Sequence, residues 1–219
     1  MVAGRPVRKG SGMSILAVNA GAAFQIESLE GPRYRHFFDR LVRPEELGDI
    51  ALDGYGALLV PCRTAAHRLT PHAHKLRAYL DSGGTIVAMG ECHSERWLPG
   101  IRFTPVETNF WWWLEPGADL GITIASPTHP LFRRLTKRDL AWHLHGYFAT
   151  PPGAEVLVAD CEGKAIVYVD EVTTRGRMIL TSLDPFFHHG HHFMPASTRF
   201  LDGFLAWLVE EVTQTTTVR

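Results

Sequence analysis

The chain has 219 residues and a formal net charge of −1, with 45% hydrophobic and 21% charged residues. These values are ordinary for a soluble globular protein, and the mixed charges offer no extended basic surface to nucleic acid or an anionic membrane. No run approaches the roughly 20 apolar residues of a membrane-spanning helix. The three cysteines lack the spacing of a disulfide framework or structural zinc site, so we expect a cytoplasmic protein.

The N-terminus is basic and contains Gly and Pro before the first apolar run. Asn19 and Gly21 interrupt that run, which disfavours a signal peptide. No internal repeat or linker divides the remainder. We therefore predict a disordered leader at 1–12, a single domain at 13–212 and a tail at 213–219.

Strands and helices alternate in the first half of the chain. Short apolar runs rich in β-branched residues predict strands at 14–19, 40–42, 55–61 and 85–89. Helices are expected at 27–39, interrupted by Gly31-Pro32, and from Thr70 as N-cap to the Gly pair at 83–84. A strand, a helix and a strand in succession form a β-α-β unit, which predicts a parallel sheet.

Antiparallel strands are expected in the second half. Turn residues at 115–117 predict an antiparallel excursion around 101–125, as a hairpin from Arg102 to Ile124. Further strands at 156–159, 164–169 and 177–183 precede an amphipathic helix at 196–212. The predicted fold class is α/β: a flavodoxin-like, mostly parallel sheet flanked by helices, with this antiparallel excursion.

Several of these segments resemble a known superfamily. Tyr55 to Pro61, Leu80 to Gly84 and Thr85 to Gly90 resemble the class I glutamine-amidotransferase-like superfamily, which is flavodoxin-like. Ser126 to Phe132 and Gly176 to Leu183 are similar to two segments of its ThuA-like branch, a relative of the trimerisation domain of some β-galactosidases. Asp184-Pro185 stands where that branch often has Gly-His. The resemblance implies a small polar ligand, such as a sugar derivative, a role in carbohydrate metabolism and a homo-oligomer.

The resemblance also implies a position for a catalytic cysteine nucleophile. Catalytic members carry a cysteine on a tight turn after the strand equivalent to 85–89, and one branch has a Cys-His pair there, which Cys92-His93 resembles. Gly90 occupies the usual nucleophile position, however, and Cys92 comes two residues later. In a hydrolytic reading Cys92 is the nucleophile and His188 or His145 the base. The alternative is an inert, partly buried thiol.

Polar residues follow the predicted strands at the edge where α/β proteins bind ligands. The expected ligand-binding residues are Asn19, Cys62, Glu91, His93, Asp184 and His189. Four imidazoles occur within 188–192, and His143 and His145 share one face of an extended segment. Neutral imidazole is the commonest metal ligand. His143, His145 and His188 are therefore candidate ligands of a divalent metal, with a polar loop that caps backbone groups as the alternative.

Three successive tryptophans at 111–113 form the last unusual feature. Alternate side chains of an extended chain face opposite ways, so at least one ring is expected at an interface or groove. Oligomer contact is favoured over ligand binding. Three functions remain open: an amidotransferase-like enzyme acting on a small polar molecule, a non-catalytic ligand-binding or oligomerisation module, and a metal-dependent enzyme.

Overall fold

The structure is a computed structural model that describes residues 14–108 and 110–217. The predicted leader at 1–12 and the last two residues of the predicted tail lie outside the described residues. None of the described helices is both long and apolar enough to cross a membrane.

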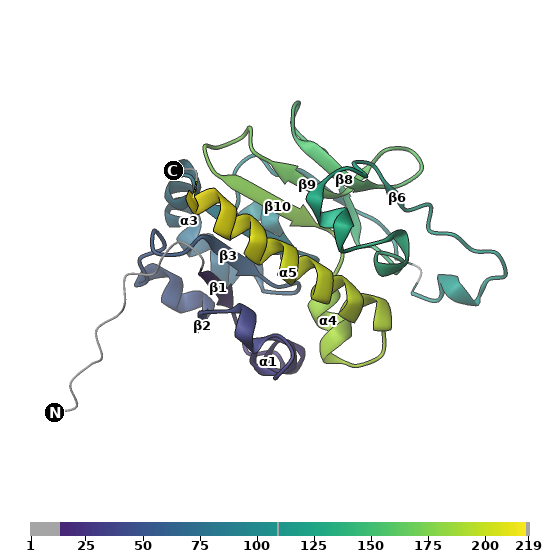
Figure 1. The fold of residues 1–219 in the computed structure, drawn as a ribbon, viewed down its shortest axis with the longest axis horizontal. Helices are drawn as coiled ribbons and strands as arrows, with labels where there is room; N and C mark the ends of the chain where they lie inside the picture. The colour runs from purple at the N-terminus through teal and green to yellow at the C-terminus, as the bar shows by residue number, and fades with distance from the viewer. Residues whose placement is uncertain (1–13, 109, 218–219) are drawn as a thin grey trace.

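Ten strands form one sheet, whose main path runs β2-β1-β3-β4-β10-β9-β7-β5, with β8 paired to β9 and β6 paired to β8. The parallel strands are β1 (Ile15–Val18), β2 (Arg40–Val42), β3 (Ala57–Val60), β4 (Thr85–Met89) and β10 (Arg177–Thr181). β1, β3, β4 and β10 consist mostly of buried apolar residues. Figure 1 shows β1, β3 and β10 beside the C-terminal helix. The predicted α/β fold with a flavodoxin-like sheet is confirmed.

Antiparallel strands extend the sheet beyond β10. They are β5 (Phe103–Pro105), β6 (Thr123–Ile124), β7 (Gly146–Phe148), β8 (Glu155–Ala159) and β9 (Ala165–Asp170). The predicted antiparallel character around 101–125 is present, but β5 pairs with β7 and β6 pairs with β8. The predicted hairpin between Arg102 and Ile124 is therefore wrong. Each of these short strands pairs with a strand that lies farther along the chain.

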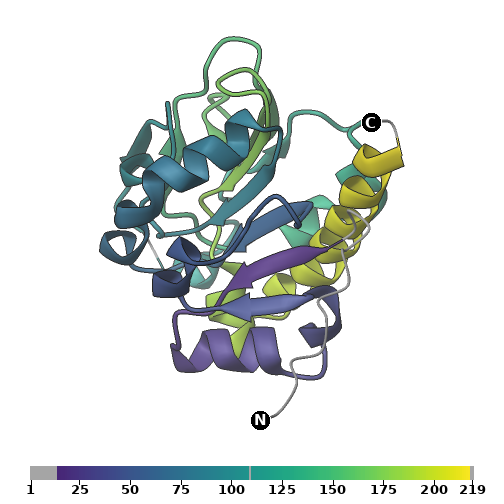
Figure 2. The same ribbon diagram turned by 90° about the vertical axis from the view of Figure 1, so that its left-hand side faces the viewer.

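Helices cover both faces of the sheet. On one face lie α1 (Ala23–Glu30), α4 (Pro185–Gly190) and α5 (Pro195–Thr217), and on the other lie α2 (Ala66–Leu69) and α3 (Ala73–Asp81). Figure 2 shows α5 (yellow) and α3 (blue) on opposite sides of the strands. In β4, Val87 and Met89 belong to the apolar cluster of α5, whereas Ile86 and Ala88 belong to that of α3. This alternation explains why the strand is apolar throughout.

Short 3-10 turns connect these elements, at Arg35–Phe37, Pro44–Gly48, Thr70–His72, Ser94–Arg96, Trp112–Leu114, Pro130–Arg133 and Lys137–Asp139. Several helix boundaries differ from expectation. The helical segment between β3 and β4 begins with α2 at Ala66, four residues before the predicted N-cap at Thr70. The Thr70 hydroxyl donates to the Ala66 carbonyl (2.9 Å) and does not cap a helix. The first helix ends at Glu30 because Gly31-Pro32 follows, and α5 continues past residue 212 to Thr217.

Candidate functional site

Asp184 lies at the centre of a buried polar cluster at the carboxyl end of β10. An aspartate at the N-cap of a helix ordinarily accepts hydrogen bonds from the first turn, but Asp184 makes no such bond to α4. Its side chain is fully buried and turns to other groups. Trp142 Nε1 donates to Oδ1 (3.3 Å), His188 Nε2 lies 3.0 Å from Oδ1, and His145 Nε2 lies 3.1 Å from Oδ2. The carboxylate is thus committed to the cluster and not to the helix.

Three histidines from two segments converge on this carboxylate. His143 and His145 precede β7 in extended chain, so their side chains point to the same side, with ring centroids 5.2 Å apart. His188 comes from α4, one helical turn after Asp184. The Nε2 atoms of His143 and His188 are 3.1 Å apart, and His143 Nε2 is 3.9 Å from Asp184 Oδ1. All three rings are buried.

Arg63 and Glu91 complete the cluster toward solvent. Arg63 follows β3 in the left-handed backbone region, with φ of 58°. Its NH2 lies 3.1 Å from Glu91 Oε2 and 3.6 Å from Asp184 Oδ2, and its guanidinium packs 3.7 Å from the Phe187 ring centroid. Glu91 Oε1 lies 3.4 Å from His145 Nδ1. Arg63 is not among the site residues expected from the sequence, although its place after a strand end is a usable signal.

The surroundings fix the charge of two groups. Burial favours the neutral form of Asp184, but the interactions with His145 and His188 outweigh it and hold its pKa well below the usual range. Burial lowers the pKa of His143 to about 4, against the opposing effect of Asp184. Near neutral pH the cluster therefore contains an ionised carboxylate and a neutral imidazole, the forms that bind metal ions.

Two sets of side chains bring their donor atoms within 4.8 Å of one another: His143, Asp184 and His188, and Glu91, His145 and Asp184. Two nitrogen ligands at about 2.0–2.1 Å from a tetrahedral zinc ion are about 3.3 Å apart. In the first set, the separations of 3.0 and 3.1 Å are close to this spacing, and the separation of 3.9 Å is longer. Glu91 in the second set is 40% exposed and is already paired with Arg63. The first set is therefore the better candidate for a metal centre.

A cavity of about 660 Å³ adjoins His143 and His188. It is lined by Phe110, Trp111, Trp112, Ala141, Trp142, His143, Phe187, His188, Phe193, Met194 and Pro195. The Phe110 ring packs edge-on against His143, with centroids 4.7 Å apart. Trp111 and Trp112, from the predicted aromatic groove or interface, lie in its wall; the side chain of Trp113 is outside the described residues.

The cysteines lie in less reactive surroundings than the nucleophile hypothesis requires. Cys92 is buried in the apolar cluster on the α3 face, and burial raises the pKa of its thiol to about 12. Cys62 is also fully buried; burial, followed by the nearby Asp184 charge, raises its pKa well above the usual value. Its Sγ accepts a hydrogen bond from the Phe187 N–H (3.3 Å). Neither site favours the thiolate that nucleophilic attack needs.

Gly90 stands where the sequence resemblance places a nucleophile, and the structure leaves no room there for a side chain. Its φ is 58°, and a Cβ there would lie 2.5 Å from Cys62 Cβ and 3.0 Å from Asp184 Cβ. Any side chain at this position would force Cys62 to move and would press against Asp184.

Three further predicted ligand-binding residues lie outside the cluster. The Asn19 amide donates to Glu30 Oε1 (2.7 Å), and its Oδ1 accepts from the Gly21 N–H, so it braces a turn. His93 is exposed beside Glu95. His189 Nδ1 lies 2.8 Å from the Thr198 hydroxyl, because adjacent residues of a helix point about 100° apart. Of the four histidines in 188–192, only His188 enters the described cluster.

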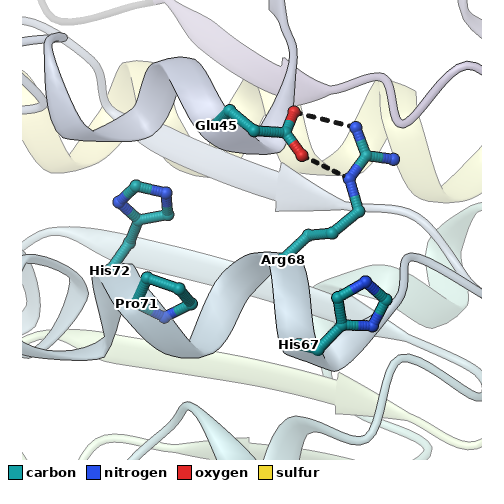
Figure 3. Close-up of a pocket in the computed structure, with 5 residues that line it drawn as sticks. All are labelled: Glu45, His67, Arg68, Pro71 and His72. Atoms are coloured by element: carbon teal, nitrogen blue, oxygen red, sulfur yellow. Dashed lines mark hydrogen bonds and ion pairs between the residues drawn. The ribbon is translucent and has the colours of Figure 1, made fainter.

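A second hollow, of about 670 Å³, lies between the 3-10 turn Pro44–Gly48 and α2. Figure 3 shows its lining residues: Glu45, His67, Arg68, Pro71 and His72. The Arg68 guanidinium bonds both Glu45 oxygens (2.5 and 2.8 Å) and the Ala20 carbonyl (2.9 Å). Its charge is thus already paired within the protein.

No protein-family model matches the chain, and no curated protein matches it. Among solved structures, a cytoplasmic protein from Salmonella typhimurium LT2 has a TM-score of 0.52 at 12% identity, over 88% of this chain and 98% of that one. A putative ThuA-like protein from Bacteroides uniformis ATCC 8492 has a TM-score of 0.49 at 9% identity, over 93% of each chain. The exo-β-1,4-mannosidase Op5Man5 from Opitutaceae bacterium strain TAV5 has a TM-score of 0.49 at 11% identity, over 89% of this chain and 35% of that one. At such identities the first likeness shows a shared fold, and the other two carry no functional argument.

Proposed function

We propose that this protein is a metal-dependent enzyme that acts on a small organic molecule in the cavity beside the histidine cluster. The observation that carries the proposal is the arrangement of His143, Asp184 and His188. Their donor atoms all lie within 4.8 Å of one another, and all three side chains are buried. Two imidazoles and a carboxylate suit zinc, and equally iron(II) or manganese.

His143, Asp184 and His188 would hold the metal, which would supply electrophilic chemistry, because three protein ligands would leave a coordination position for water or for the bound molecule. With His188 Nε2 used as a ligand, His145 is the remaining histidine of the cluster, and it lies behind the residues that line the cavity. Glu91 and Asp184 lie 3.4 and 3.1 Å from its two ring nitrogens and fix the orientation of its ring. Arg63 balances the charge of both carboxylates.

The ion is expected to exchange more readily than in a structural zinc site. Metal-bound imidazoles usually donate their second N–H to a partner, and losing that partner typically lowers affinity about 10–100-fold. Among the described residues, the Nδ1 atoms of His143 and His188 have no hydrogen-bond partner. Metal uptake is therefore best measured by adding the ion and not from the content of the purified protein.

The test is a zinc titration by calorimetry on protein without a histidine tag. We expect one equivalent to bind, and His188→Gln to weaken binding about 100-fold or more, through loss of a ligand. His189→Gln is the matched control, since His189 is the next residue in α4 but faces Thr198. Equal zinc binding by the wild type and both variants would overturn the proposal.

A non-catalytic ligand-binding module is the second candidate function, favoured by Gly90 and the two inert cysteines. Turnover of any ligand by the zinc-loaded protein would exclude it. We also propose membership of the ThuA-like branch of the amidotransferase-like superfamily, on the segments at 126–132 and 176–183. A cytoplasmic location and a homo-oligomer remain proposals, which fractionation of cells and light scattering test.

A further inference from the structure

The wall of the cavity is far less polar than a site for a sugar. Among its lining side chains, only those of His143 and His188 are ionisable. The other polar side-chain groups are the N–H groups of the three tryptophans, and that of Trp142 already donates to Asp184. A carbohydrate carries many hydroxyl groups, each of which costs free energy when buried without a partner. This wall offers such groups few partners, so it does not fit the sugar-derived ligand that the sequence resemblance implies.

The same wall holds apolar surface that the fold itself leaves exposed. Six large hydrophobic side chains are exposed among the described residues, and three of them line this cavity. They are Phe110, Trp111 and Phe193, exposed by 49%, 66% and 55%. Concentrated exposed apolar surface marks a binding site. Its continuity with a buried polar cluster, and a volume typical of small-molecule sites, favour a small ligand over a protein partner.

We infer that the natural ligand has an apolar, ring-bearing body that packs against Phe110, Trp111 and Phe193, and a single polar head directed at His143 and His188. The coordination of the polar head by a metal rests on the proposed function. The apolar nature of the rest of the ligand does not depend on it. A flat ring bound against this wall can make favourable offset-stacked or edge-on contacts with the aromatic side chains. The ligand class is therefore an aromatic or alicyclic molecule with one metal-coordinating group, such as a carboxylate or hydroxamate.

A pair of probes with the same head isolates the contribution of the body. Benzohydroxamate and acetohydroxamate both coordinate zinc, but only the first has a ring. On zinc-loaded protein, calorimetry should show benzohydroxamate binding about tenfold tighter or more, because the ring buries additional apolar area. Glucose should show no binding. Equal affinity for the two hydroxamates, or tighter binding of glucose, would overturn the inference while leaving the metal proposal intact.

Variants then locate the contact. Trp111→Ala and Phe193→Ala should remove most of the advantage of benzohydroxamate and leave acetohydroxamate unchanged. Val172→Ala is the control, since Val172 is 51% exposed but does not line this cavity. A control effect as large as that of Trp111→Ala would contradict the assignment.

Failure of the metal proposal gives a different result. If no zinc binds, phenol serves as a probe without a coordinating head, with tryptophan fluorescence as the readout. Phenol binding that Trp111→Ala abolishes supports the apolar body; absence of binding overturns it. The other possible occupant of the cavity wall is a second copy of the chain, which light scattering detects. A dimer that Trp111→Ala dissociates would make this wall a contact between two copies and overturn the inference.

Discussion

The two hollows of this protein have nearly the same volume, about 660 and 670 Å³, yet differ in how their polar groups are satisfied. Around the hollow at Glu45, the charges are exposed and pair with each other (Figure 3). In the cluster beside the aromatic cavity, buried polar atoms lack hydrogen-bond partners among the described residues. They are Arg63 Nε, His143 Nδ1 and His188 Nδ1. Unsatisfied buried polarity, more than volume, distinguishes a functional site.

The largest difference is expected on removing the carboxylate at each place. Asp184→Ala should lower the free energy of unfolding by about 3–5 kcal/mol, because it leaves buried partners without their counter-charge. Glu45→Ala should change it little, because the Glu45–Arg68 pair lies at the surface. Urea unfolding measures both. Comparable losses for the two variants would remove the distinction between the hollows.

The next largest difference between the two hollows is expected in the stabilisation of the fold by added zinc. An ion that binds only the folded state stabilises it by about 2.7 kcal/mol at a concentration 100 times its dissociation constant. His143→Gln should abolish this gain. The double variant His67→Gln/His72→Gln, which removes both histidines of the other hollow, should retain it. Thermal unfolding with and without zinc is the measurement, and a gain that disappears only in the double variant would reverse the assignment.

Much of this fold could be predicted, since its strands are short apolar runs bounded by turns. The segments at 40–42 and 85–89 match β2 and β4 residue for residue. The pairing of 101–125 could not be predicted, because two short segments can pair with each other or with distant edges. Only spatial proximity decides between these arrangements.

The site was partly predictable for a related reason. Strand ends and histidine clustering indicated His143, His145, His188 and Asp184, and the structure brings these together. The aromatic cavity was indicated only as a groove or interface, because its wall joins segments far apart in the sequence. The role of Cys92 depends on burial, which adjacent residues do not reveal.

A smaller effect is expected from closing the space behind the cluster. Gly90 and Gly117 both adopt positive φ, 58° and 76°, but a Cβ at Gly117 meets nothing within 4 Å. Alanine at either position costs about 1–2 kcal/mol for the left-handed backbone. Gly90→Ala should cost more, because its Cβ would collide with Cys62 and press against Asp184, and should also weaken zinc binding. Equal losses in urea unfolding would show that the space behind the cluster is not constrained.

The smallest effect concerns the pH response of the paired charges in the second hollow. The Arg68 hydrogen bond lowers the pKa of Glu45 from 4.5 to about 2. A carboxylate whose pKa falls on folding contributes stability above its unfolded value, and this contribution is lost as the pH falls through 4.5 toward 2. Because Glu45 is well exposed, solvent screens the pair and the contribution should be small. An NMR titration of the Glu45 carboxyl checks the shift, and Arg68→Gln should raise the midpoint toward 4.5. Zinc binding at the other hollow should be unchanged in Arg68→Gln, and a change there would mean that the two hollows are coupled.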